Sequence, residues 1–235
     1  MTFPPALAHG PITPVVDGVF LVRGAYRMGP GIVISRTMTI VKNPDGLVLL
    51  NAIRLSDAGQ NELDRFGKIK HIVKLSESHG IDEPFCVNRY KPDVWAVPDA
   101  KLGAGVAATK VLGPASPVQA GIVVDFPGSA GWKERALWIP NAGGTLITCD
   151  VLQNHVDGEF TSAAGRIMSS VLGFKGGVIV APMWRRMQKL KGTRLTQALA
   201  GISRLNFANL VTGHGPAVVG DAGQLVQAAI ERASA

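Results

Sequence analysis

The sequence predicts a layered α/β protein in which β-sheets are flanked by helices. Short apolar runs, rich in β-branched residues and bounded by Gly or Pro, fill the first half of the chain and indicate strands. Helical spacing of apolar residues dominates from about residue 160, and a helix is also expected between two strands over residues 57–66. This mixture favours layered α/β over all-β architecture, and the strict βαβ alternation of a doubly wound sheet is absent.

Length and composition are those of one globular domain spanning residues 1–235. Hydrophobic residues make up 46% of the chain and charged residues 17%, which allows a sizeable core and argues against disorder. Two cysteines, Cys86 and Cys149, provide no disulfide framework, and no secretory signal pattern opens the sequence. We therefore expect a cytoplasmic protein.

The net charge of +7 comes in part from a basic segment, residues 185–194. We interpret this segment as a solvated helix face, because no aromatic side chains alternate with its charges. Recognised nucleic-acid-binding motifs are absent, so no nucleic-acid partner is expected. The longest apolar runs are far shorter than the roughly 20 residues of a membrane span, so no membrane partner is expected either.

Each expected element of the first half has a local reason. Asn-Pro and Asp-Gly in "NPDG" are strong turn signals between two strands. Ser56 or Asp57 can cap the helix over residues 57–66, which ends before Gly67. The expected strands cover residues 18–24, two segments of 31–53, residues 68–75 and residues 89–98.

The second half begins with three strands expected over residues 121–150, the last two forming a hairpin around "NAGG". His155 falls in a loop expected after these strands, with a surface or capping role preferred to a place in a cleft. Pro182 suits the first turn of a helix, and Asp221 can cap the closing helix. The other expected elements are helices over 160–173, 181–192, 193–205 and 221–234 and a strand over 209–215.

Three of the expected strands end in residues that can bind a metal ion or move a proton. "HIVKL" leads to Glu77, His79 and Asp82, "GTLITC" leads to Asp150, and "NLVTG" leads to His214. In layered α/β folds, ligands gather where loops leave the ends of strands. Imidazole and carboxylate groups together suit zinc, iron or manganese. Each residue alone is more simply explained as a turn former or surface group, whereas the three strand ends together favour a metal cleft.

The order of these segments resembles the metallo-β-lactamase fold from about residue 15 to residue 220. "PDGLVLL" is similar to the early hairpin of that fold, "LITCD" to the strand that carries its metal-bridging aspartate, and "TGHGP" to its late histidine strand. The resemblance implies a four-layer αββα sandwich built from two β-rich halves.

The main metal loop departs from the family pattern His-x-His-x-Asp-His. His79 keeps the second histidine, whereas Glu77, Ile81 and Asp82 stand in place of the first histidine, the aspartate and the last histidine. The family's middle histidine corresponds to Ser129 in "PGSAG". The resemblance therefore implies at most one divalent ion per chain, or none.

Two functions follow from this comparison. The first is a metal-dependent hydrolase in which His79, Asp150 and His214 hold one zinc, iron or manganese ion that activates a water molecule. Glu77 or Asp82 would complete the metal shell or take a proton, and the partner would be a small-molecule substrate such as an ester, lactone or phosphoester. The alternative is a non-catalytic binding or interaction module that has lost its metal centre, which the substitutions in the loop favour.

Overall fold

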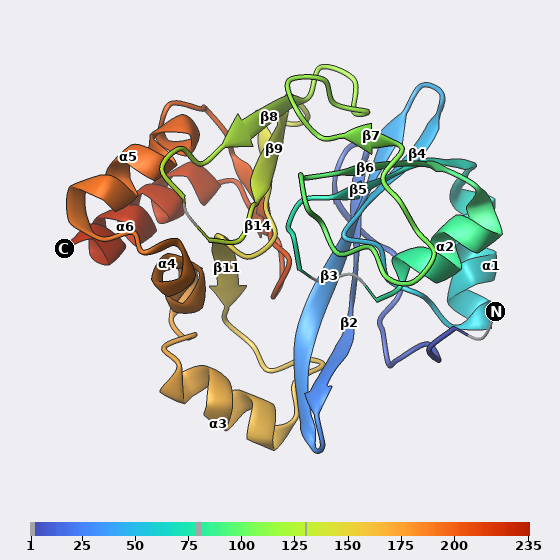
Figure 1. Ribbon diagram of the computed structural model, residues 1–235, viewed down its shortest axis with the longest axis horizontal. Coiled ribbons are helices and arrows are strands. Elements are labelled where there is room, and N and C mark those ends of the chain that lie inside the picture. Colours follow the sequence, from blue (N-terminus) through green and yellow to red (C-terminus); the bar gives the residue numbers. More distant parts are fainter. Residues whose placement is uncertain (1–2, 79–80, 130) are drawn as a thin grey trace.

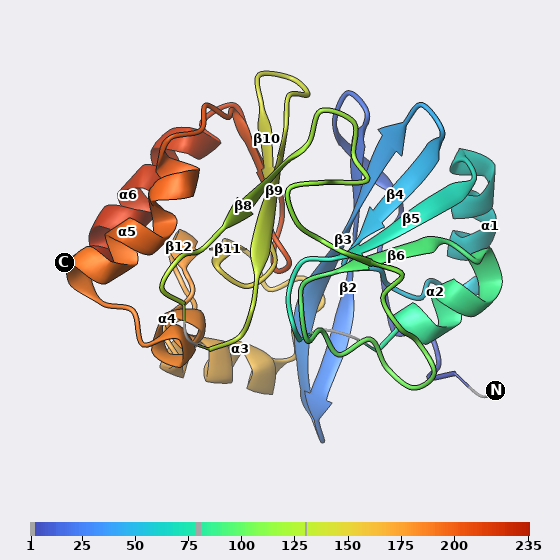
Figure 2. The ribbon, with the colours of Figure 1, turned by 45° about the horizontal axis from the view of Figure 1, so that its top comes forward.

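The computed structural model describes residues 3–78, 81–129 and 131–235, which form a four-layer αββα sandwich (Figure 1). Helices α1 (Asp57–Phe66) and α2 (Glu83–Tyr90) cover the outer face of the first sheet. Helices α4 (Pro182–Gln188), α5 (Gly192–Ser203) and α6 (Ala222–Ser234) cover the second. Figure 2 shows the two helical layers on opposite sides of the paired sheets. The layered α/β prediction is therefore confirmed.

The first sheet has seven strands in sequence order. The pairs from β1 to β4 are antiparallel and those from β4 to β7 are parallel. The strands are β1 (Thr13–Val16), β2 (Val19–Gly29), β3 (Ile32–Asn43), β4 (Gly46–Leu50), β5 (Ile69–Lys74), β6 (Asp93–Ala96) and β7 (Lys110–Val111).

The second sheet has the strand order β14-β13-β10-β9-β8. Only β10 and β13 run parallel within it, so their carboxyl ends leave the sheet at the same edge. A separate antiparallel pair, β11 with β12, packs beside it. These strands are β8 (Ile122–Asp125), β9 (Arg135–Ile139), β10 (Thr145–Ile147), β11 (Leu152–His155), β12 (Gly177–Val180), β13 (Asn209–Val211) and β14 (Val218–Val219).

Four groups of buried apolar side chains are present among the described residues, and the three largest hold the layers together. Leu50, Val73 and Ile147 are among those between the two sheets. The other two large groups join each sheet to its helices, where Leu63 of α1 and Leu199 of α5 are fully enclosed. Within the described residues, no helix is both long and apolar enough to cross a membrane.

Most local predictions are confirmed. Helix α1 spans residues 57–66 as expected, and the Ser56 hydroxyl caps it by accepting a hydrogen bond from the Gly59 N–H at 3.3 Å. Helix α5 buries Leu195, Leu199 and Ile202. Asp221 stands at the N-cap position of α6, but its side chain makes no capping hydrogen bond.

Several features differ from the sequence-based picture. Strands β1, β7, β12 and β14 were not expected. Helix α2, which begins near Pro84, was not expected. The loop predicted around His155 was wrong, because residues 152–155 form β11. Helix α3 (Ala163–Val171) is present as expected, but it lies beside β3 and leaves Ile167 and Val171 exposed (Figure 1).

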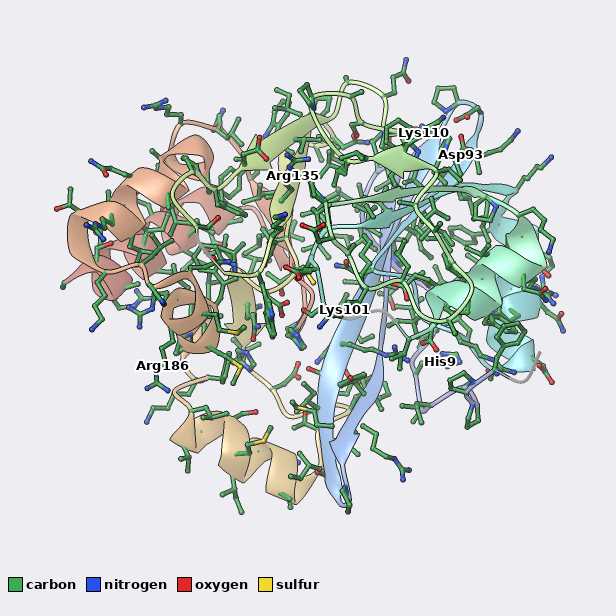
Figure 3. All side chains as sticks on the ribbon, in the orientation of Figure 1. His9, Asp93, Lys101, Lys110, Arg135 and Arg186 are labelled. Carbon is green, nitrogen blue, oxygen red and sulfur yellow. The ribbon has the colours of Figure 1, made fainter. Side chains whose placement is uncertain are left out.

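The basic segment 185–194 spans most of α4 and the start of α5, and Arg186 projects from α4 at the molecular surface (Figure 3). Arg185 is an exception within it, because its Nη1 donates to the Ala233 carbonyl at 2.6 Å. The exposed basic residues of the segment are Arg186, Lys189, Lys191 and Arg194.

Candidate functional site

Asp150 and His214 meet at the edge where β10 and β13 end. Ile147 pairs with Val211 in the parallel register, and each site residue follows three positions later. His214 Nε2 lies 3.4 Å from Asp150 Oδ1, and both side chains are largely buried. The shared edge of two parallel strands thus brings two of the predicted residues together.

The backbone fixes the orientation of the His214 ring. His214 Nδ1 lies 2.6 Å from the carbonyl oxygen of Ser35 in β3. A carbonyl can only accept a hydrogen bond, so Nδ1 carries a proton, and Nε2 is the ring nitrogen that faces Asp150. Metal-binding histidines commonly donate their second N–H to a carbonyl or carboxylate in this way.

The Asp150 carboxylate is held from the other sheet. Its Oδ2 accepts hydrogen bonds from the hydroxyls of Ser76 and Ser78, both at 3.2 Å. These serines follow β5, the strand whose end was expected to reach the site. Because Oδ2 is engaged by the serines, Oδ1 is the oxygen that faces His214.

Glu134 clamps the turn that carries Asp150. Its Oε1 accepts the backbone N–H groups of Cys149, Asp150 and Val151 at 3.1, 2.8 and 3.0 Å. Burial and the nearby Asp150 charge hold the pKa of Glu134 well above its ordinary value of 4.5, against the opposing effect of the three N–H donors. Among the described residues its Oε2 has no hydrogen-bond partner. The sequence did not identify this residue.

Two glycines let the loop around His214 approach its neighbours. A Cβ on Gly213 would lie 2.8 Å from the Cys149 carbonyl oxygen. At Gly215, where φ is +92°, a Cβ would lie 1.7 Å from the Asn154 carbonyl oxygen. Thr37 in β3 completes the attachment, since its N–H donates to the Gly213 carbonyl at 2.9 Å.

A pocket of about 610 Å³ opens onto this pair. That volume is within the range of roughly 300–1,000 Å³ that is usual for small-molecule sites. Its walls come from the β2–β3 hairpin, β11, α3 and α4. Apolar residues that line it include Met28, Ile34, Met168, Leu172, Phe174 and Trp184.

Fixed contacts hold the segment that connects β11 to α3, which forms part of the wall. The Arg23 guanidinium binds both oxygens of Asp157 at 3.0 and 2.7 Å and also Glu159 at 2.6 Å. The Ser162 hydroxyl donates to the Gly31 carbonyl at 2.9 Å, and the N–H of Val33 donates to that hydroxyl at 3.0 Å. These contacts tie the wall to both strands of the β2–β3 hairpin.

His155 also lines the pocket, which differs from the surface role preferred for it from the sequence. Its Nε2 lies 2.7 Å from Gln153 Oε1, and its ring packs against Phe174. Burial, with a smaller effect from His214, lowers the pKa of His155 to about 4. The ring is therefore neutral at physiological pH.

The sequence matches no protein-family model and no curated protein. Solved structures are similar over nearly the whole chain. The DIM-1 metallo-β-lactamase is 16% identical, with 98% of this chain and 99% of that chain covered and a TM-score of 0.62. The mono-zinc form of the metallo-β-lactamase FIM-1 from Pseudomonas aeruginosa is 12% identical, with 98% of each chain covered and a TM-score of 0.62. The chain has the metallo-β-lactamase fold.

A third structure of this fold, a metallo-β-lactamase from Hirschia baltica, is 12% identical, with 94% and 97% of the two chains covered and a TM-score of 0.59. At such identities the similarity defines the fold, and activity has to be argued from the residues of the site.

The other predicted residues of the metallo-β-lactamase motif are placed as follows. His79 lies outside the described residues. Asp82 is buried, where Arg36 Nη2 approaches its Oδ2 at 2.6 Å and the Arg54 N–H donates to the same oxygen at 3.0 Å. Glu77 Oε2 accepts the Lys133 N–H at 3.1 Å. Neither Asp82 nor Glu77 lines the pocket.

The position that corresponds to the middle histidine of the metallo-β-lactamase motif makes a local contact. The Ser129 hydroxyl donates to the Phe126 carbonyl at 2.7 Å, and Ser129 does not line the pocket. The neighbouring loop is attached to α4 by the buried side chain of Gln188, which accepts the Gly131 N–H at 2.8 Å. This loop therefore contributes Trp132 to the pocket wall and contributes no histidine.

The Asp150–His214 pair fits one metal ion. Zinc–ligand distances of about 2.0–2.2 Å and tetrahedral angles separate two ligand atoms by about 3.4 Å. His214 Nε2 and Asp150 Oδ1 are 3.4 Å apart. Within residues 3–78, 81–129 and 131–235, no group of three or more His, Cys, Asp or Glu forms a metal site. Zinc sites normally have three or four protein ligands, so the two described donors alone do not complete one.

Proposed function

We propose that the protein is a hydrolase that cleaves a small carboxylic ester or lactone with one divalent ion held by Asp150 and His214. The separation of 3.4 Å between His214 Nε2 and Asp150 Oδ1, at the polar end of the pocket, carries the proposal. His79 is the third ligand that the motif predicts. The pocket walls expose more apolar than polar surface and also include Arg166 and Lys175. The apolar surface favours an uncharged ester over a phosphoester, because desolvating a phosphate against it is costly.

The residues of the chain prepare the site before substrate arrives. The Ser35 carbonyl fixes the His214 tautomer, and the hydroxyls of Ser76 and Ser78 hold Asp150 with Oδ1 toward His214. A divalent ion held there by Asp150 and His214 would lower the pKa of water and polarise a substrate carbonyl. In the overall reaction, a water oxygen bonds to the acyl carbon, the acyl C–O bond breaks, and the departing alcohol oxygen takes up a proton.

The test compares turnover and metal content in the same preparations. Chelated protein is reloaded with zinc, iron or manganese and assayed with nitrophenyl acetate and a simple lactone. We expect turnover with at least one metal, and a loss of at least about 100-fold in His214→Gln and Asp150→Asn, since each removes a ligand. His71→Gln is the control, because His71 lies on β5 outside the pocket. No turnover with any metal would overturn the proposal.

A second candidate is a binding module without a metal. The contacts of Asp82 with Arg36 and of Glu77 with Lys133 favour it, because they engage two motif positions that carry histidines in the family pattern. This candidate predicts that ligands bind equally well before and after chelation and are recovered unchanged. Metal-dependent turnover that disappears in His214→Gln would exclude it.

A further inference from the structure

The pocket has a polar end and an apolar body. The polar end is formed by Asp150 and His214, with Ser78 beside them. Apolar side chains of α3, α4 and the loop after α3 line most of the body, namely Met168, Leu172, Phe174, Met183 and Trp184. The basic side chains Arg166 and Lys175 also line the pocket. A ligand that matches both parts has one polar group, placed at the Asp150–His214 pair, and a hydrocarbon portion that extends between α3 and α4.

Apolar side chains are also exposed around the rim of this pocket. Met28, Val156 and Met183 line the pocket and are 52%, 63% and 38% exposed. Ile167 and Val171, on the helix that forms one wall, are 67% and 81% exposed. Three of the large apolar side chains exposed on the described surface thus line this one opening, whereas Ile167 and Val171 do not line it. Apolar surface concentrated at the mouth of a pocket indicates a ligand that covers it.

The lining favours an unbranched, flexible chain over a rigid ring system. Met28, Met168 and Met183 contribute unbranched side chains with three rotatable bonds, which adjust to irregular and variable ligand shapes. The wall itself is fixed by the ion pairs of Arg23 with Asp157 and Glu159. The methionine side chains thus give this lining a surface that can adjust to the ligand.

We propose, resting on the proposed function, that the substrate is a carboxylic ester or lactone that carries a straight hydrocarbon chain of medium length. The carbonyl group lies at Asp150 and His214, and the chain lies against Leu172, Phe174 and Met183. Burial of each methylene strengthens binding about fourfold, which corresponds to about 0.8 kcal/mol. Affinity should therefore rise steadily with chain length until the pocket is filled.

Binding to chelated protein tests this inference independently of catalysis. The probes are methyl esters of straight-chain acids with four, six and eight carbons, and the signal is the fluorescence of Trp132 and Trp184, which line the pocket. We expect the dissociation constant to fall about fourfold for each added methylene. Equal affinity for the three esters would overturn the inference.

A pair of matched variants locates the binding site. Met183 on α4 and Leu225 on α6 are 38% and 39% exposed, and only Met183 lines the pocket. Glutamate is favourable near a helix N-terminus, so Met183→Glu should fold. We expect Met183→Glu to weaken binding of the eight-carbon ester at least about tenfold, Met183→Leu to retain it, and Leu225→Glu to leave it unchanged. An equal loss in the two glutamate variants would overturn the assignment to this pocket.

Turnover measurements separate the two proposals. Chain-length-dependent binding without turnover under any metal would support the ligand class and overturn the hydrolase. Metal-dependent turnover with the same KM for all three esters would support the hydrolase proposal and overturn the inference that the substrate carries a hydrocarbon chain.

Discussion

Replacing Glu134 with alanine should destabilise the protein far more than replacing it with glutamine. Glu134 lies in the core between the two sheets, and its neighbour Arg135 pairs through the backbone with Leu75 at 2.8 Å. Its carboxylate is the acceptor for the turn that carries Asp150. The two substitutions therefore separate the loss of this acceptor from the loss of the carboxyl group.

The magnitude follows from the three N–H groups bound to Glu134 Oε1, those of Cys149, Asp150 and Val151. A buried donor left without an acceptor costs about 1–3 kcal/mol, so alanine should lower the free energy of unfolding by about 3–9 kcal/mol. Whole domains are typically stable by only about 5–15 kcal/mol. Glutamine retains an acceptor oxygen of the same reach, and we expect it to change stability by no more than about 1 kcal/mol.

The assay is equilibrium unfolding in urea, followed by circular dichroism and tryptophan fluorescence. Glu231→Ala is the control, because this glutamate is exposed on α6. A loss of less than about 1 kcal/mol in Glu134→Ala, or equal losses in the alanine and glutamine variants, would refute the acceptor role.

Four further results are expected. Gly215→Ala should lower the free energy of unfolding by more than about 2 kcal/mol, and by more than Gly220→Ala does. Both positions have positive φ, but only Gly215 lacks space for a Cβ. Urea unfolding of the two variants checks this. The depressed pKa of His155 means that the unfolded chain binds a proton between pH 6.5 and about 4 that the folded protein does not. Stability should therefore fall by up to about 3 kcal/mol as pH decreases through this window, and less in His155→Gln, as measured by thermal unfolding across pH. Asp82→Asn should lower stability by about 3 kcal/mol because it leaves Arg36 buried without its anionic partner, whereas an unchanged melting temperature would contradict this ion-pair role. Protein purified without added metal should carry no more than about one divalent ion per chain, and brief chelation should remove it without unfolding the protein, as elemental analysis and calorimetry would establish.

The fold was largely predictable because its main signals are local. Pro, Gly and Asn mark the turn between β3 and β4, and Ser56 marks the start of α1. Strand β11 had no such signal, since its residues 152–155 are mostly polar and its partner β12 begins only at Gly177. Helix α3 shows that helical spacing of apolar residues does not guarantee burial, because Ile167 and Val171 follow this spacing and yet face solvent.

The site was predictable only where strand ends define it. Asp150 and His214 could be identified because a strand precedes each of them, and the parallel pairing of β10 and β13 places both at one edge. Glu134 could not, because a glutamate at the start of a strand ordinarily faces solvent, and the turn that it binds lies 15–17 residues further along the chain. The partnership of Asp82 with Arg36 joins distant segments and has no local signature.

Contacts within the protein hold the segment between β5 and α2 on both sides of the predicted metal loop. Glu77 donates its N–H to the Lys133 carbonyl at 2.9 Å and accepts the Lys133 N–H with its side chain. Five residues later, Asp82 is fixed by Arg36. In a zinc finger, metal binding supplies the free energy of folding, because no other contacts hold the ligands in place. Here the ends of the loop are supported by β3 and by the start of β9, so a metal at Asp150 and His214 would add to the stability of a chain that is already folded. The fold of this segment therefore depends on the contacts of Glu77 and Asp82 with neighbouring strands and does not require metal ligands at these two positions.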